Sequence, residues 1–203
     1  MTRSERLAEQ LDWHWRKNLR PRLDGLTDEE YFWEPVRGCW SIRPRGTSAV
    51  PMSEGSGEWT TDSAPPVPVP APVTTIAWRL AHIIVSCLGY RVGWYFGGQD
   101  VDSQTFTYAG TADEALKQLD EMYGRWNTGV RKLSDADLDD PPTVGPERFP
   151  MENRVLHVNR ELIHHGAGIS LLRDLYRRQD KAVPHRTTPT GAPTTSPAYL
   201  YTE

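Results

Sequence analysis

Residues 151–178, MENRVLHVNRELIHHGAGISLLRDLYRR, decide the fold, because they hold three of the chain's six histidines and an acid within one long helical pattern. At about 100° per residue, one apolar stripe that should face a core is formed by Val158, Leu162, Ile169, Leu172 and Tyr176. His165 falls in the middle of this stripe, and Glu161 falls at its edge one turn earlier. A carboxylate and an imidazole on a buried face are costly unless they pair or bind a metal. We therefore expect chemistry at this pair.

Two further long helices flank the middle of the chain. Residues 74–96 are apolar almost all round, as in a central helix, and include His82. Thr74 or Thr75 can cap this helix, and the glycine pair at 97–98 ends it. Residues 111–133 repeat apolar side chains at helical spacing, and Thr111 with Glu114 predicts a capping box at the start.

The N-terminal region predicts one long and one short helix. Residues 4–23 carry apolar side chains at i, i+4 spacing, and Pro21 should end or kink that helix. Thr27 and Glu30 predict another capping box, followed by a short helix that ends before Pro35.

The remaining segments lack a helical pattern. Residues 36–73 contain four glycines and the run PPVPVPAP at 65–72, which favours extended backbone and a loop that is functional or partly disordered. Residues 134–150 read as a loop, and residues 180–203 read as a flexible polar tail. With no convincing strand, we expect an all-α, four-helix bundle over residues 1–179, with 36–73 as a loop insertion between helices one and two.

Composition narrows the class of protein. The chain has 203 residues, enough for one domain, and its net charge of −4 suggests neither nucleic acid nor an acidic membrane as partner. Two cysteines give no disulfide framework, and no window reaches the roughly 18 apolar residues of a membrane span. The N-terminus lacks an apolar signal-peptide core, so we expect a soluble cytoplasmic protein. Eight tryptophans and eight tyrosines leave aromatic surface for a homodimer face.

Bundle cores build metal sites from side chains that project inward from different helices. His82, Glu161 and His165 fit such a site, and two histidines with one carboxylate suit zinc, nickel, iron or manganese with open coordination positions. Other interpretations stay open. His82 alone could be a hydrogen-bonded core residue, Glu161 with His165 could be a surface pair, and His164 could replace His165 as the ligand.

The segments WRLAHI (78–83), NRELIHHGA (159–167), LTDEE (26–30) and CWSI (39–42) resemble an actinobacterial branch of the DinB/YfiT-like superfamily of metalloenzymes. The resemblance covers roughly residues 4–178. It implies a four-helix bundle with a divalent metal, held by one histidine of helix two and a pair on helix four. Most members have His-x-x-x-His at that pair, whereas Glu161-x-x-x-His165 resembles the mycothiol-dependent maleylpyruvate isomerase branch.

The resemblance implies thiol chemistry and weakly favours a dimer. A low-molecular-weight thiol would bind an open position on the metal, for which zinc is the preferred ion, and would attack a small electrophile. The thiol would be mycothiol if the source is an actinobacterium. The reaction would be that of a transferase or an isomerase. His82, Glu161 and His165 would be ligands, while His157 or His164 would orient ligands or carry protons. Two alternatives are a thiol-independent metal hydrolase and a non-catalytic, stress-associated ligand-binding protein.

Overall fold

The computed structural model describes residues 1–98, 100–144 and 148–179, and these residues are mostly helical. Four continuous helical segments account for most of them. They are α1 (Arg3–His14) with η1 (Trp15–Leu19) and α2 (Arg20–Leu23), α4 (Ile76–Ala81) with η2 (His82–Gly89) and α5 (Tyr90–Phe96), α6 (Ala112–Arg131), and α8 (Met151–Tyr176). Two short helices, α3 (Asp28–Phe32) and α7 (Asp135–Asp139), lie in the connections. The predicted helices are present, with ends that differ by a few residues.

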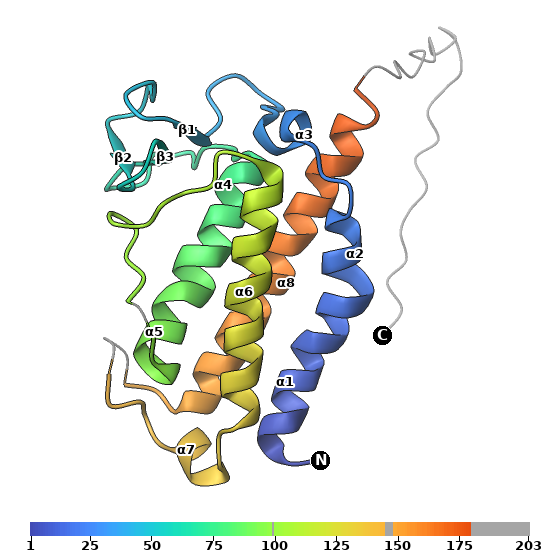
Figure 1. Ribbon diagram of the computed structural model, residues 1–203, viewed down its shortest axis with the longest axis vertical. Helices are drawn as coiled ribbons and strands as arrows, with labels where there is room; N and C mark the ends of the chain where they lie inside the picture. The colour runs from blue at the N-terminus through green and yellow to red at the C-terminus, as the bar shows by residue number, and fades with distance from the viewer. Residues whose placement is uncertain (99, 145–147, 180–203) are drawn as a thin grey trace, which may run out of the picture.

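The four segments lie side by side around a common core (Figure 1). The first segment packs on α6 and α8, and so does the second, α4–η2–α5. The first and second segments therefore lie diagonally across the core, which the long connection between them allows. Within the described residues, every helix is too short or too polar to cross a lipid bilayer.

The predicted caps are largely present. Thr27 accepts the Glu30 N–H, and Glu30 accepts the Thr27 N–H, which completes the first capping box. Thr111 accepts the Glu114 N–H, but the Glu114 carboxylate turns to the N–H of Gly110, so only half of the second box forms. The 180–203 tail prediction lies outside the described residues.

The prediction that the chain has no strand was wrong. Residues 42–63 form a small antiparallel sheet of β1 (Ile42–Pro44), β2 (Met52–Glu54) and β3 (Trp59–Ser63), with β3 in the centre. The sheet lies beside the start of α4, at the end of the helices away from α7 (Figure 1). Because the buried side chains of β3 are the polar Thr60 and Asp62, the strand shows no apolar alternation in the sequence.

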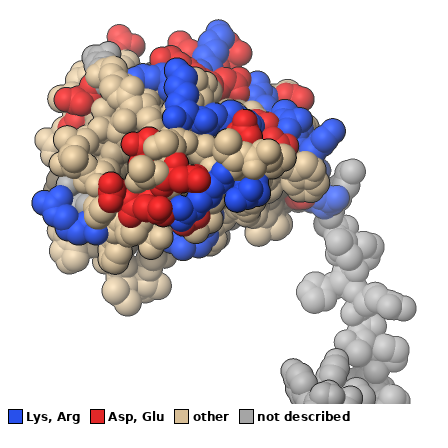
Figure 2. All heavy atoms as spheres, turned by 90° about the horizontal axis from the view of Figure 1, so that it is seen from below, with Lys and Arg blue, Asp and Glu red and all other residues tan. Residues whose placement is uncertain are grey.

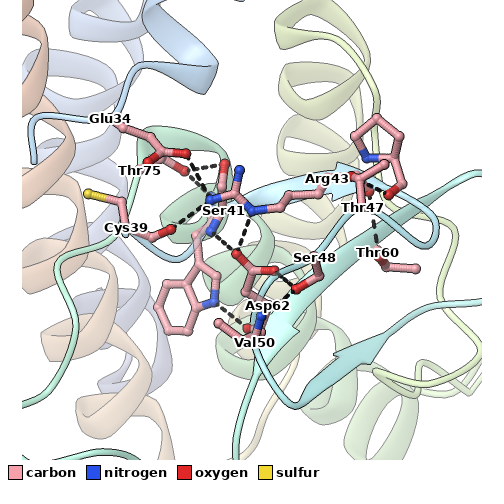
Figure 3. Close-up of polar contacts among 12 residues, drawn as sticks. Glu34, Cys39, Ser41, Arg43, Thr47, Ser48, Val50, Thr60, Asp62 and Thr75 are labelled. Atoms are coloured by element: carbon pink, nitrogen blue, oxygen red, sulfur yellow. Dashed lines mark hydrogen bonds and ion pairs between the residues drawn. The ribbon is translucent and has the colours of Figure 1, made fainter. Parts of the chain in front are cut away.

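Asp62 holds the sheet together from inside (Figure 3). Its carboxylate is buried and accepts hydrogen bonds from the Ser41 N–H (2.9 Å), the Arg43 Nε (2.9 Å) and the Ser48 hydroxyl (2.6 Å). A buried charge is tolerated when it is paired and hydrogen-bonded in this way. Hydrogen bonds to one buried carboxylate therefore hold these short strands together in place of an apolar core.

The same network fixes the start of α4. The Trp78 indole donates to the Asp62 carbonyl (3.0 Å), and the Ser41 hydroxyl lies 2.9 Å from that of Thr75, which caps the helix. Trp78 in turn stacks on the His82 ring, with centroids 5.2 Å apart and planes 6° apart. The sheet therefore determines where His82 lies.

A buried ion pair anchors the C-terminal half of α8. Arg173 Nη2 lies 2.6 Å from Glu30 Oε2, and the two side chains are 1% and 4% exposed. The guanidinium also donates to the main-chain carbonyls of Arg22, Asp24 and Gly25. Burial by itself would raise the pKa of Glu30, but the hydrogen bond and charge of Arg173 outweigh it, and the net result is a lowered pKa.

Acidic and basic side chains are interspersed at the end of the molecule seen in Figure 2. Ion pairs join the elements there. Arg3 of α1 lies 2.5 Å from Asp139 of α7 and also pairs with Glu152 of α8. These pairs are partly exposed, so we assign them little stability individually.

Arg173→Met should lower the free energy of unfolding by about 3–5 kcal/mol, because it leaves the Glu30 carboxylate buried without its partner. Urea unfolding measures this loss. Arg178→Met is the control, since Arg178 is 68% exposed in its pair with Asp174, and it should cost less than about 1 kcal/mol. Equal losses in the two variants would contradict the anchoring role of Arg173.

The wild-type protein should lose stability in acid through Glu30. Because the folded-state pKa of Glu30 is lowered, its contribution is complete above the unfolded-state pKa of about 4.3 and disappears as pH falls through the lower folded value. Unfolding of wild type and Glu30→Gln, compared from neutral pH down to about pH 3, should show a shallower acid decline in the variant. Parallel declines would show that Glu30 is not a source of the acid sensitivity.

Candidate metal centre

A π-helical turn shapes the centre of the second helical segment. In η2 the Tyr90 N–H bonds to the Val85 carbonyl, five residues back. Five residues of α-helix would turn His82 and Cys87 about 140° apart, whereas i→i+5 bonding brings residue i+5 above residue i. His82 and Cys87 therefore lie on one face of this segment.

Three donor groups meet at this face. Ligand atoms of His82, Cys87 and His165 all lie within 4.8 Å of one another. The rings of His82 and His165 meet edge to face, with centroids 4.5 Å apart. The structure thus brings together the histidines predicted from helices two and four, and it adds a thiol.

Glu161 is not a member of this group of mutually close ligand atoms, but it lies beside one member, His165. Its Oε2 is 3.5 Å from His165 Nε2, and the two side chains are 25% and 15% exposed. Two ligands of one tetrahedral zinc ion, each about 2.0–2.1 Å from the metal, lie about 3.4 Å apart. The separation of Glu161 and His165 therefore suits two ligands that share an ion.

The protonation states suit metal binding. Burial, followed by the charge of His165, lowers the pKa of His82 to about 4, so His82 is neutral at pH 7. Burial also lowers the pKa of His165, with a smaller effect from His164. In contrast, burial raises the pKa of Cys87 to about 12, which keeps it a thiol in the metal-free protein.

The His165 ring has a vacant bonding position. Its Nδ1 atom is buried and has no hydrogen-bond partner among the described residues. Buried polar atoms without partners are rare and destabilising, and a bound cation is one way to satisfy an imidazole nitrogen. His165 Nε2 faces Glu161, so Nδ1 is not the nitrogen that would share an ion with that carboxylate. The fit of the donor set to a divalent ion rests on the two neutral imidazoles and the adjacent carboxylate.

A cavity of about 130 Å³ lies beside His82, between the helix and the sheet. Aromatic rings and polar groups of the helix, the sheet and the connections next to them line it, including those of Trp40, Glu54, Ser63, Trp78, Ser86 and Tyr108. A larger groove of about 570 Å³ lies between α5 and α6, but no histidine lines it. The small cavity therefore adjoins the candidate centre at His82, the one residue of the centre that lines it, and the large groove lies elsewhere.

The two other predicted histidines of α8 lie near the centre without joining it. His157 Nδ1 is 2.6 Å from Arg160 Nη2 and 3.8 Å from Glu161 Oε1. His164 is exposed, and its ring centroid is 5.1 Å from that of His165. His157 is thus a neighbour of Glu161, and His164 is a neighbour of His165.

Cys87 was missed in the sequence. Its spacing from His82 places the two residues on different faces of an α-helix, and no residue in HIIVSCLG signals a π-helical turn. The only available signal was the apolar character of the segment all round, which predicts that Cys87 is buried without indicating what it contacts.

The comparisons with known proteins support one relationship. A sequence profile described as the DinB superfamily matches residues 10–169. No curated protein and no solved structure gives a match. The match covers well over half of the chain, including α4, η2 and most of α8 with every residue of the candidate centre. The chain belongs to the DinB superfamily.

Proposed function

We propose that this chain is a metal-dependent transferase or isomerase that uses a low-molecular-weight thiol of the mycothiol type, built on a four-helix bundle of the DinB type. The observation that carries the proposal is the meeting of two neutral, partly buried imidazoles from different helices, one of which lies beside a carboxylate. Family membership supports the same interpretation. A site of this kind has no evident structural purpose unless something binds it.

In this proposal His82, Glu161 and His165 hold the ion, and zinc suits this donor set best, with nickel, iron and manganese as alternatives. Glu161 is favoured as the third ligand because it lies at a co-ligand distance from His165 and on the exposed side. Cys87 is 3% exposed, and burial raises its pKa in the metal-free protein, so its thiolate costs more to form than the carboxylate of Glu161. Three protein ligands leave a coordination position open.

A bound divalent ion would favour the thiolate form of a thiol at neutral pH. The chain's own residues would orient the reactants and move the proton. Trp78 fixes the plane of His82 by stacking, and Asp62 fixes Trp78. His157 faces Glu161, and His164 reaches solvent beside His165, so either can carry the thiol proton away.

The sheet supplies the remaining wall of the site. Glu54 and Ser63 of the sheet line the cavity beside His82, and they are hydrogen-bonded to each other at 3.0 Å. Because residues of segment 36–73 line this cavity, we assign the choice of electrophile to that segment. The proposal does not depend on a particular electrophile.

Glu161→Ala and His165→Ala should each lower bound zinc at least tenfold, because each removes one of three ligands, while Cys87→Ala should keep about one zinc per chain. Mass spectrometry of protein purified without affinity-tag metal measures this. His14→Ala, which removes a histidine outside the centre, is the control. Wild type that takes up no metal, or zinc lost with Cys87 but kept without Glu161, would overturn the proposed ligand set.

A cobalt-loaded protein reports the open position directly. Wild type should lack a sulfur-to-cobalt charge-transfer band in the near ultraviolet until a thiol is added, because Cys87 is not a ligand in the proposed set. The band should then appear in both wild type and Cys87→Ala. A band that is present before thiol addition and absent in Cys87→Ala would indicate four protein ligands and a closed site. Ester or amide turnover without any thiol would instead favour hydrolysis.

A further inference from the structure

Arg79 lies beside the candidate centre, three residues before His82 on α4. Its guanidinium reaches across to α8 at Gly168, three residues after His165. A Cβ atom built on Gly168 would lie 2.4 Å from Arg79 Nη1, so the absence of a side chain there makes room for the guanidinium. Arg79 is thus one helical turn from His82, and its guanidinium meets α8 one turn from His165.

This guanidinium has no counter-charge among the described residues. Its Nε is buried without a hydrogen-bond partner, and no ion pair within the described ranges joins Arg79 to a carboxylate. Burial is the cause that lowers the pKa of Arg79, with no acid offsetting it. By contrast, Arg43 pairs with Asp62 and Glu34, and Arg173 pairs with Glu30. Leaving a partly buried cation unpaired costs stability, and an anionic ligand beside Arg79 would remove that cost.

The charge balance of the centre indicates the sign of that partner. A divalent cation would add two positive charges next to Arg79, and Glu161 would offset only one of them. Arg160 also faces Glu161, with its Nε 3.6 Å from Oε1. An anionic group between the metal and Arg79 would be attracted to both. A guanidinium presents a planar fork of donors that matches a carboxylate in two parallel hydrogen bonds.

We propose that Arg79 is the binding site for a carboxylate of the molecule that occupies the open metal position. This inference rests on the proposed function and adds a substrate class to it: a thiol or electrophile that carries a carboxylate next to its reacting atom. Gly168 belongs to the same site, because it leaves the space in which the guanidinium lies. Arg79 would position the ligand and take no part in bond making or breaking.

The test compares two small thiols that differ in one group. Mercaptoacetate carries a carboxylate where 2-mercaptoethanol carries a hydroxyl. Cobalt-loaded wild type, titrated at pH 7 and followed by its visible and near-ultraviolet spectrum, should bind mercaptoacetate at least tenfold more tightly. Arg79→Met should reduce this ratio to about one, and Arg79→Lys should keep part of it. An unchanged ratio in metal-loaded Arg79→Met would overturn the proposal.

A glycine pair provides the matched control. Gly168→Ala adds a methyl group where the guanidinium lies, so it should lower the mercaptoacetate preference while keeping the charge. Gly124→Ala should leave the preference unchanged, because the added Cβ would meet nothing within 4 Å apart from its chain neighbours and the backbone of its own helix. Equal effects of the two substitutions would contradict the placement of the carboxylate beside Gly168.

A metal-free measurement separates this inference from the proposed function. In protein stripped of metal, Arg79→Met should melt at or above the wild-type temperature, because it removes an unpaired charge. Mercaptoacetate, compared with chloride at equal ionic strength, should raise the melting temperature of wild type and not that of the variant. A marked loss of stability in Arg79→Met, or no effect of mercaptoacetate on wild type, would show a packing role instead. If wild type binds no metal, the proposed function is contradicted. The melting measurement on metal-free protein still shows whether Arg79 binds a carboxylate.

Discussion

The edge-to-face contact of His82 and His165 is the constraint on which the rest of the structure depends. Two imidazoles from different helices share one partly buried place, and burial holds both in the neutral form. An edge-to-face contact alone does not fix the orientation of either ring. Other residues must therefore hold each imidazole in place. The surrounding fold supplies this orientation from two sides.

From the side of α4, the orientation comes through Trp78 and the sheet. Asp62 gathers the sheet around one buried carboxylate, and its carbonyl holds the Trp78 indole. From the side of α8, it comes through the Glu30–Arg173 ion pair, which fixes the helix against the turn that follows α2. Both anchors are buried charges paired with an opposite charge, and each is also hydrogen-bonded to the main chain. Arg79 differs from both because the chain gives it no carboxylate partner in the part that the structure describes.

The helical core could be predicted from the sequence because its apolar periodicity is strong. Val158, Leu162 and Ile169 are fully buried, as the stripe on α8 indicates, and His165 lies at its margin, 15% exposed. The sheet could not be predicted, since its central strand buries Thr60 and Asp62 in place of apolar side chains. Cys87 could not be placed because a π-helical turn changes the angular spacing that sequence reading assumes. Arg173 is 1% exposed, and no local pattern distinguishes it from the exposed arginines that follow.

Zinc X-ray absorption on the zinc-loaded protein tests the central claim most directly, because it reports which elements surround the ion. The account predicts only nitrogen and oxygen neighbours at about 2.0–2.2 Å before a thiol is added, and one sulfur neighbour at about 2.3 Å afterwards. A sulfur neighbour in the thiol-free protein, with no change on adding thiol, would assign Cys87 as a ligand of a closed site. That result would contradict an open metal centre formed by His82, Glu161 and His165.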